Sequence, residues 1–493
     1  MSSAASQPLP GTMPSMDSEE ERMLKELITW PEPPGTITFT SSTSARNCDF
    51  RILHPRASYS VGENLEVVLT ARDQRALPKT YGGDFFRAKL HSFQLKAGVL
   101  GSVHDHMNGT YIVTFLLPWP GDVEISIQLR HSSEAVQILK KLRDSRPDKV
   151  FFYGHFQMNG TTEVMECNLE IPDRPLCEYV DPRTGEKWVC VRPETLPCSS
   201  YIYHSSGGNK RITTIEEDRF FDHSLMERES RSKEEGFEVL PEPEMVLLNT
   251  SSCSLGLAVP QPTGFYYNDV WTSLTCSHKM FASSATASAC LKGKIVYMFG
   301  DSTLRQWWEY LLELIPSIKQ IDLHVVHKSG PLLAVDADNG FMMQWRGHGN
   351  PLRTDKMRRV NLHYMANDIA GIGDGPDVVI AFTAWAHFTC YPVEVYIQRL
   401  RNIRGAIKEL LERSPQTTVI IKTANTGAQS VYGSDWLSLQ LDLVMKKMFS
   451  DLPVAIVDTW EMTSCHYLDY QIHPEKVIVQ NEVDMFLSFI CPS

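Results

Sequence analysis

Short apolar strands alternate with helical segments through the second half of the chain, and this alternation restricts the fold more than any other feature. Strand-like runs lie at residues 294–299, 377–382, 418–422 and 454–458. Apolar residues recur with helical spacing between them, at residues 304–312, 393–412 and 436–449. Buried strands that alternate with helices form a mainly parallel sheet that is covered on both faces. We therefore expect residues 263–493 to form an α/β/α domain.

The first part of the chain follows another pattern, in which apolar and polar residues alternate in short runs between turn signals. Such runs lie at residues 65–70, 110–117 and 123–129. Asn108-Gly109 precedes the second of them and is typical of a hairpin turn. This pattern predicts a β-sandwich of immunoglobulin type over residues 36–145, which includes a helical segment at 135–142. Residues 1–35 are rich in Ser and Pro and then acidic, so we expect a flexible tail.

The middle of the chain is divided between a cysteine-rich piece and an acidic piece. Four of the 11 cysteines lie in a loop-rich extension at residues 146–201, namely Cys167, Cys177, Cys190 and Cys198. We expect them to be bonded among themselves, in an order left open, because a stretch that buries little apolar surface is stabilised by crosslinks. We also expect Cys276 to pair with Cys290. Residues 202–262 carry many acidic side chains and predict a solvated linker or exposed loop.

Composition and short motifs bear on the partners and the compartment. The net charge of −12 argues against a dedicated nucleic-acid binder. No apolar run approaches the ~20 residues that span a bilayer, so we expect no transmembrane segment. The cysteines and the sequons at Asn108, Asn159 and Asn249 favour the secretory pathway, in the Golgi lumen or outside the cell. The first 30 residues nevertheless contain no apolar core of a signal peptide.

Two elements of the second half carry residues for nucleophilic chemistry. Ser302 follows a buried strand and precedes a helix, whose N-terminal N–H groups point back at the turn. His473 follows the last strand, within Asp469-Tyr-Gln-Ile-His473-Pro474. A Ser hydroxyl needs a His to accept its proton, and the His needs a carboxylate that orients its ring. Because both residues follow strands of one sheet, we expect Ser302 and His473 to meet.

With these residues in view, the chain resembles the neurexophilin and PC-esterase (NXPE) family. The residues that carry the resemblance lie at 190–198, 264–276, 290–294, 300–311, 345–349 and 473–474. The resemblance implies a neurexophilin-like immunoglobulin-type front domain and a PC-esterase domain of SGNH hydrolase type. Relatives of the latter are O-acetyltransferases or acetylesterases of glycans, and the family is linked to O-acetylation of sialic acid.

Carried over by position, the resemblance implies Ser302 as nucleophile and His473 as general base. Asp469 is the expected acidic partner, although the family pattern puts the Asp three residues before the His, where this chain has Tyr470. Asp458 is the alternative. The N–H groups of Ser302 and Gly347 are the expected oxyanion donors. The loop after residue 382, where an Asn is expected, reads Thr383-Ala-Trp-Ala-His387 instead.

The sequence leaves two hypotheses about function. The first is a glycan O-acyltransferase or acetylesterase that works through an acyl-enzyme on Ser302, with a donor such as acetyl-CoA if it is a transferase and with sialylated glycoproteins among its substrates. The second is a catalytically degenerate extracellular protein of neurexophilin type, whose β-sandwich binds a cell-surface protein. Neither hypothesis requires a bound cofactor, and no sequence pattern calls for a metal.

Overall fold

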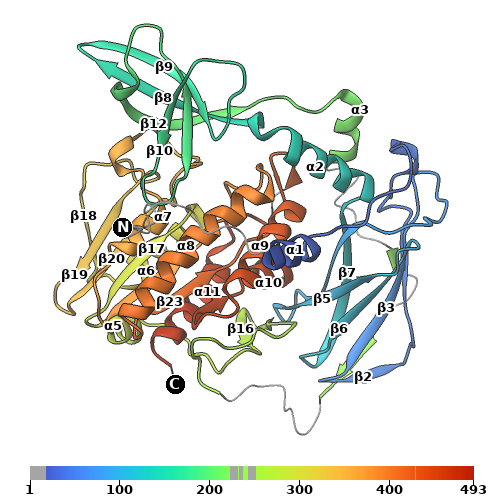
Figure 1. Cartoon of the computed structure of the whole chain (residues 1–493). Helices are drawn as coiled ribbons and strands as arrows, with labels where there is room; N and C mark the ends of the chain where they lie inside the picture. Colours follow the sequence, from blue (N-terminus) through green and yellow to red (C-terminus); the bar gives the residue numbers. More distant parts are fainter. Residues whose placement is uncertain (1–17, 223–230, 233–236, 242–250, 428, 493) are drawn as a thin grey trace, which may run out of the picture.

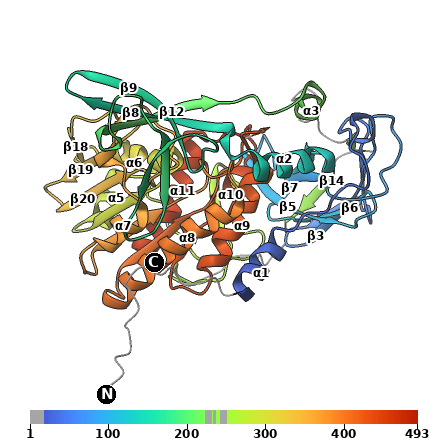
Figure 2. The ribbon, with the colours of Figure 1, turned by 45° about the horizontal axis from the view of Figure 1, so that its top comes forward.

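The protein consists of a β-rich front domain, a cysteine-rich sheet and an α/β back domain (Figure 1). The structure is a computed structural model that describes residues 18–222, 231–232, 237–241, 251–427 and 429–492. In Figure 1 the blue strands of the front domain lie to the right of the orange and red helices of the back domain. Figure 2 shows from a second direction that the two domains lie side by side, with the cysteine-rich strands above the back domain.

The back domain is built on a seven-stranded sheet whose order is β18-β19-β20-β17-β22-β23-β26. The strands are β17 (Ile295–Phe299), β18 (Lys319–Ile321), β19 (Leu332–Asp336), β20 (Phe341–Arg346), β22 (Val378–Phe382), β23 (Thr418–Lys422) and β26 (Ala455–Val457). β20, β17, β22, β23 and β26 are parallel, whereas β18 and β19 join one edge in antiparallel pairs. The chain starts the parallel sheet at β17 and then extends it on both sides. Ligands of open α/β sheets bind beyond the strand ends at such a switch point.

Helices cover both faces of this sheet, as the alternating pattern predicts. They are α5 (Ser284–Leu291), α6 (Ser302–Leu314), α7 (Met365–Ala370), α8 (Val393–Arg413), α9 (Asp435–Phe449), α10 (Thr459–Cys465) and α11 (Lys476–Ile490). One hydrophobic core joins α7, α8 and α9 to side chains such as Ile380 and Phe382, and another joins α5, α6 and α11 to Val379 and Ala381. Neighbouring residues of β22 thus face opposite layers, which explains its unbroken apolar run.

The front domain is a continuous set of paired strands, in the order β13-β1-β3-β6-β5-β4-β7-β14-β2. They are β1 (Asp49–Ile52), β2 (Ser58–Ser60), β3 (Asn64–Thr70), β4 (Phe85–Ser92), β5 (Ala97–Asp105), β6 (Thr110–Leu116), β7 (Gly121–His131), β13 (Arg231–Ser232) and β14 (Phe237–Leu240). Alternate residues such as Val67, Val113 and Phe115 are fully buried in its core. Helix α2 (Ser133–Ser145) follows β7 and begins at Ser132, whose side chain accepts a hydrogen bond from Ala135 N.

A six-stranded sheet occupies the cysteine-rich extension and reaches into both flanking parts of the chain. Its order is β10-β11-β9-β8-β12-β21. The strands are β8 (Val150–Met158), β9 (Thr161–Asn168), β10 (Leu176–Val180), β11 (Lys187–Val191), β12 (Tyr201–Asn209) and β21 (Met357–Arg358). Because β21 belongs to the back domain, this sheet is anchored on it.

Two domain limits expected from the sequence differ from the structure. Residues 18–27, expected in the flexible tail, form helix α1 (Ser18–Leu27), and Leu24 is fully buried in the core of the back domain. The segment 202–262, expected as a linker, contributes β12 and β14 to two different sheets. Both differences come from contacts with distant parts of the chain, which local composition does not reveal.

The disulfides confirm one expectation and correct another. Cys167 bonds to Cys190 and Cys177 bonds to Cys198, so the four cysteines of the extension pair among themselves. The expected Cys276–Cys290 bond is wrong, because Cys276 bonds to Cys253 and Cys290 bonds to Cys491. Helix α11 brings Cys491 to the end of α5, although the two cysteines are 201 positions apart in sequence. Four disulfides within the described residues fit a protein of the secretory route.

Candidate functional site

Ser302 lies at the carboxyl end of β17, as the first residue of α6. Asp301 is the N-cap of this helix, and its side chain accepts hydrogen bonds from the N–H (2.8 Å) and the hydroxyl (2.7 Å) of Thr303. The Asp301 side chain is fully buried, whereas Ser302 is half-buried. A local strand–turn–helix unit therefore positions the Ser302 hydroxyl at the sheet edge.

His473 meets Ser302 across 171 residues of sequence. Ser302 Oγ and His473 Nε2 lie 2.7 Å apart, which is hydrogen-bond distance. Partial desolvation lowers the pKa of the His473 imidazole, and the negative charge of Asp301 acts in the opposite direction. The neutral ring is the form that can accept the hydroxyl proton. The sequence-predicted pair is thus brought together in the geometry that nucleophile activation requires.

The segment that carries His473 has no regular structure and depends on tertiary contacts. It runs from the end of α10 to the start of α11. Asn425 Nδ2 donates to Ile472 O (2.9 Å), and Lys89 Nζ of the front domain donates to His466 O (2.6 Å). The ring of Tyr470 lies 3.4 Å from the guanidinium carbon of Arg87, which also belongs to the front domain. The front domain therefore helps to hold the segment.

The structure does not bring the expected carboxylates to His473. Asp469 is exposed and lies in a surface hollow beside Glu475 and Lys476. Since the segment is not helical, four residues of separation do not place two side chains on one face. Asp458 caps α10 and bonds to Lys446 Nζ (2.6 Å). Across the described residues, the contact with Ser302 is the one hydrogen bond of the His473 ring.

Gly347 is placed at the same sheet edge as Ser302. It follows β20, whose Arg346 pairs with Phe299, and Arg346 O accepts a hydrogen bond from Gly300 N (2.9 Å). The backbone after β20 consequently runs alongside the turn that bears Ser302. This position is compatible with the role of oxyanion donor that the resemblance implies.

A pair of histidines, which sequence reasoning did not select, stands beside the nucleophile. His387 ends the divergent loop after β22 and lines a pocket of about 30 Å³ together with Ser302. His348 Nε2 lies 2.9 Å from His387 Nδ1, which also accepts a hydrogen bond from Arg353 N (3.4 Å). Burial lowers the pKa of both rings, so they are neutral near pH 7. Because His387 Nδ1 is an acceptor, its Nε2 carries the hydrogen.

Cationic side chains surround the same pocket. Arg305, Lys328 and Arg353 are among its lining residues. Arg305 Nη1 donates to Lys328 O (3.1 Å), and its guanidinium lies over the ring of Trp345. The signal that could have indicated His387 was its place at a strand end of this sheet, where the other site residues also lie.

The candidate glycosylation sites lie in loops on the surface. Asn108 is exposed in the hairpin between β5 and β6, where Met107 and Gly109 have positive φ. Asn159 is exposed in the hairpin between β8 and β9, and its own φ is 49°. Asn249 lies outside the described residues. None of the helices in the described part of the chain is long and apolar enough to cross a bilayer.

Comparison with known families covers both domains. Residues 271–491 match the family described as NXPE family member 4-like, C-terminal domain. Residues 17–225 match the family described as Neurexophilin. The chain belongs to the NXPE/neurexophilin family, as the sequence motifs indicated.

Proposed function

We propose that the protein is an acyltransferase or esterase of glycan hydroxyl groups, with an SGNH-type back domain and an immunoglobulin-type front domain. The observation that carries this proposal is the 2.7 Å contact between Ser302 Oγ and His473 Nε2 at the switch point of the parallel sheet. The front domain is a second site of contact for glycoprotein partners, and the compartment is the Golgi lumen or the cell exterior.

In the first half-reaction Ser302 Oγ attacks the acyl carbonyl carbon while its proton passes to His473 Nε2. The tetrahedral intermediate collapses, the bond to the leaving group breaks, and the leaving group takes the proton from His473. In the second half-reaction a sugar hydroxyl or water attacks the ester on Ser302 and gives its proton to His473. The bond between the acyl carbon and Ser302 Oγ then breaks, Ser302 Oγ takes the proton back from His473, and the acyl group leaves on the sugar oxygen or as the free acid.

The oxyanion of each intermediate needs donors, and three are available at the sheet edge. Ser302 N–H lies at the start of α6, where the helix dipole favours negative charge. Gly347 N–H is the second donor. We assign the third to His387 Nε2–H, which takes the place of the Asn expected in this loop, because the contacts of His387 Nδ1 leave the hydrogen on Nε2.

The dimensions and charges of the pocket support a narrower substrate class. A volume of about 30 Å³ suits an acetyl group better than a long acyl chain. Arg305, Lys328 and Arg353 favour an anionic substrate, such as a sialylated glycan or an acetyl donor with phosphate groups like acetyl-CoA. In this scheme Asp301 supplies the negative charge that stabilises the protonated His473, because its charge raises the pKa of that ring. Asp469 is not assigned a role.

The second candidate, a binding protein with a degenerate site, is favoured by one observation. No carboxylate among the described residues bonds to His473 Nδ1, so the ring lacks the partner that orients it in fully active triads.

A serine-reactive fluorophosphonate separates the two candidates. An active site is labelled at Ser302, and Ser302→Ala abolishes the label without loss of folding. Ser284→Ala is a matched control, since Ser284 is also the half-buried first residue of a helix. If wild-type protein were labelled no faster than the Ser302→Ala variant, the enzymatic proposal would be wrong. Acetylation assays with sialylated and desialylated acceptors then test the substrate class.

A further inference from the structure

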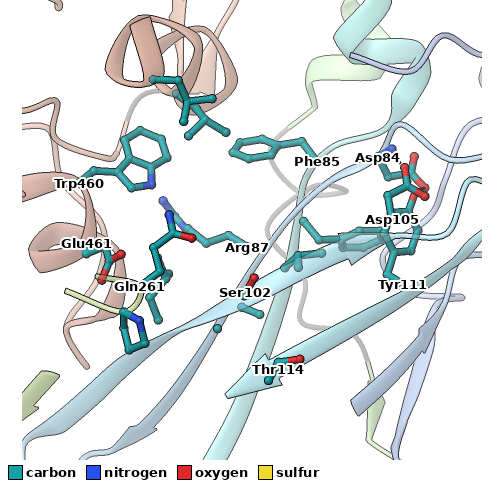
Figure 3. A pocket seen from close by; sticks show the side chains of 18 of the residues that line it. Asp84, Phe85, Arg87, Ser102, Asp105, Tyr111, Thr114, Gln261, Trp460 and Glu461 are labelled. Atoms are coloured by element: carbon teal, nitrogen blue, oxygen red, sulfur yellow. Dashed lines mark hydrogen bonds between the residues drawn. The ribbon is translucent and has the colours of Figure 1, made fainter. Parts of the chain in front are cut away.

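A cavity of about 590 Å³ between the front and back domains contains a cation that is already engaged within the protein. In Figure 3 the side chain of Arg87 extends from β4 toward Trp460. Arg87 is only 5% exposed, and it contacts Asp435 and Tyr470, which do not line this cavity. Arg87 therefore joins the two domains and does not face a ligand.

A second cavity, of about 490 Å³, lies where the cysteine-rich sheet meets the back domain, near β10 and α7 (Figure 1). The sheet supplies one wall, which carries Tyr179, Trp188 and Tyr201. The other wall comes from back-domain residues between β20 and β22, among them Arg359 and Tyr364. None of its lining residues also lines the pocket of the nucleophile. Its volume falls in the range of small-molecule sites.

Arg359 gives the second cavity a cation whose hydrogen-bond donors are unused. Its guanidinium carbon lies 4.2 Å from the ring centroid of Tyr179 and 5.0 Å from that of Tyr201, so two aromatic faces fix its position. Among the described residues no group accepts a hydrogen bond from the Arg359 side chain, and its nitrogens remain accessible. The neighbouring Arg346 and Arg399 are, by contrast, each paired with a carboxylate. Arg359 thus presents the fork of N–H groups that binds a carboxylate through two parallel hydrogen bonds.

Other polar groups of the lining restrict the charge and the polarity of the ligand. Among the described residues, Asn350 Nδ2 and the Tyr364 hydroxyl have no hydrogen-bond partner, and both remain accessible. Burial acts to raise the pKa of Asp181, but hydrogen bonds from Thr184 and Asn367 outweigh it and lower this pKa, so the Asp181 carboxylate is charged. A charged carboxylate in the same cavity as Arg359 favours a ligand with a single negative charge over a phosphate ester.

The aromatic side chains of the lining select the body of the ligand. The four rings give flat apolar faces, and the donors and the acceptor lie in the same walls. A pyranose ring has the complementary surface, because its C–H groups form an apolar face and its hydroxyl groups donate and accept hydrogen bonds. An aliphatic or flat aromatic acid would use the rings but would leave Asn350, Tyr364 and Asp181 without a partner.

We propose that this cavity binds a carboxylate-bearing sugar residue of a glycan, whose carboxylate accepts hydrogen bonds from Arg359 and whose ring packs against the aromatic walls. The proposal rests on the proposed action on glycans, for which the cavity is a further recognition site apart from Ser302. Sialic acids and uronic acids both carry the required group, so the experiment has an arm for each. Because binding is measured and not acyl transfer, a protein that is inactive toward fluorophosphonate can still meet the test.

Calorimetric titration of the purified full chain with 3′-sialyllactose, with a glucuronate-containing tetrasaccharide of hyaluronan, and with lactose and benzoate tests the proposal. One of the two acidic sugars is expected to bind saturably with a Kd below about 1 mM, and about tenfold more tightly than lactose or benzoate. Arg359→Gln should weaken that acidic sugar about tenfold and leave lactose unchanged. Arg56→Gln is the matched control, since Arg56 also lies over a tyrosine ring, at 4.3 Å from its centroid.

A second variant keeps the test decisive if Arg359→Gln does not fold. Val360 lines the cavity and is 71% exposed, so Val360→Glu should fold and should weaken the acidic sugar about threefold at low salt by charge repulsion. Ile215→Glu is its control, since Ile215 is 76% exposed and does not line the cavity.

Three results would overturn the proposal. The first is the absence of saturable binding of both acidic sugars, or equal affinity for lactose or benzoate. The second is unchanged affinity in a folded Arg359→Gln variant, or in Val360→Glu if the former does not fold. The third is loss of binding in Arg305→Gln with retention in Arg359→Gln, which would place the carboxylate in the Ser302 pocket and leave the proposed function intact.

Discussion

Ser302 stands where a strand passes into a helix, whereas His473 stands in an irregular segment, and different interactions hold the two. The turn at Ser302 is defined by hydrogen bonds within a few residues, chiefly those of Asp301 to Thr303. The segment of His473 is held by long-range contacts to Asn425, Lys89 and Arg87.

The position of the nucleophile therefore depends on the back domain, whereas the position of the base depends on contacts from both domains. Two of the three long-range contacts come from β4 of the front domain. A cation–π contact contributes about 0.5–1 kcal/mol at an exposed site and about 2 kcal/mol when it is desolvated. We therefore expect that the front domain contributes to activity by positioning His473, in addition to any binding role.

The largest effect should follow removal of the base itself. His473→Ala is expected to lower acyl-enzyme formation by at least about a thousandfold, because an unassisted Ser keeps its proton near neutral pH. Adding Ser302→Ala should cause little further loss, since the two act as a unit. Rates of fluorophosphonate labelling measure both variants, and His324→Ala, at an exposed histidine, is the control. A double variant much slower than His473→Ala would show that the two residues act separately.

The buried negative charge of Asp301 should also contribute to the activity of His473. Asp301→Asn should slow acylation by about a hundredfold, because it removes the buried charge that favours the protonated imidazole during the reaction. Folding should be retained, since Asn is an equally good helix N-cap. Asp469→Asn should change the rate by less than about twofold, because Asp469 is exposed and, among the described residues, no hydrogen bond joins it to the His473 ring. The opposite order of effects in steady-state assays would restore Asp469 as the acidic partner.

Removal of the front-domain contacts that position His473 should lower activity less than the two changes above. Tyr470→Leu should lower kcat about tenfold with little change in KM, because the ring no longer lies against Arg87 and Lys89. Tyr470→Phe keeps the aromatic face and should restore kcat. Tyr203→Leu, which removes a ring next to Lys356, serves as control. A purely structural role would instead lower the melting temperature of Tyr470→Leu and leave kcat per folded molecule unchanged.

The pH dependence of acylation gives the smallest effect. Desolvation lowers the pKa of His473, so the rate should rise with pH to a plateau and reach half its maximum below pH 6.5. Because the charge of Asp301 raises this pKa, Asp301→Asn should move the midpoint further down. Stopped-flow labelling between pH 4.5 and 8 measures the midpoint, and a value above 6.5 in the wild type would contradict the assigned environment.

The back domain could be predicted in large part because its elements follow from local periodicity. The expected strand at 418–422 is Thr418–Lys422, and the expected helix at 393–412 is Val393–Arg413. Ser302 followed from the same logic, since the place of a residue after a buried strand is a local property. The contact between Ser302 and His473 could be predicted because both residues follow strands of the same sheet.

The features that could not be predicted from the sequence depend on contacts between distant segments. Leu24 carries no signal that it packs on the back domain. Cys276 bonds to Cys253 rather than to Cys290, although Cys290 is the nearer of the two in sequence. His387 lies in the loop where the family pattern has an Asn, and the sequence does not reveal its contact with His348. Asp469 is expected because it lies next to the position of the Asp in the family pattern, and in an irregular segment such a position does not determine where the side chain lies.

The bond between Cys290 and Cys491 closes a covalent ring that contains both Ser302 and His473. A protease that cuts a loop anywhere between these cysteines opens the backbone but leaves the nucleophile and the base in one molecule. The two fragments stay at high effective concentration and can keep the sheet edge assembled. A single cut within this ring therefore does not by itself separate Ser302 from His473, as long as an oxidising environment preserves the disulfide.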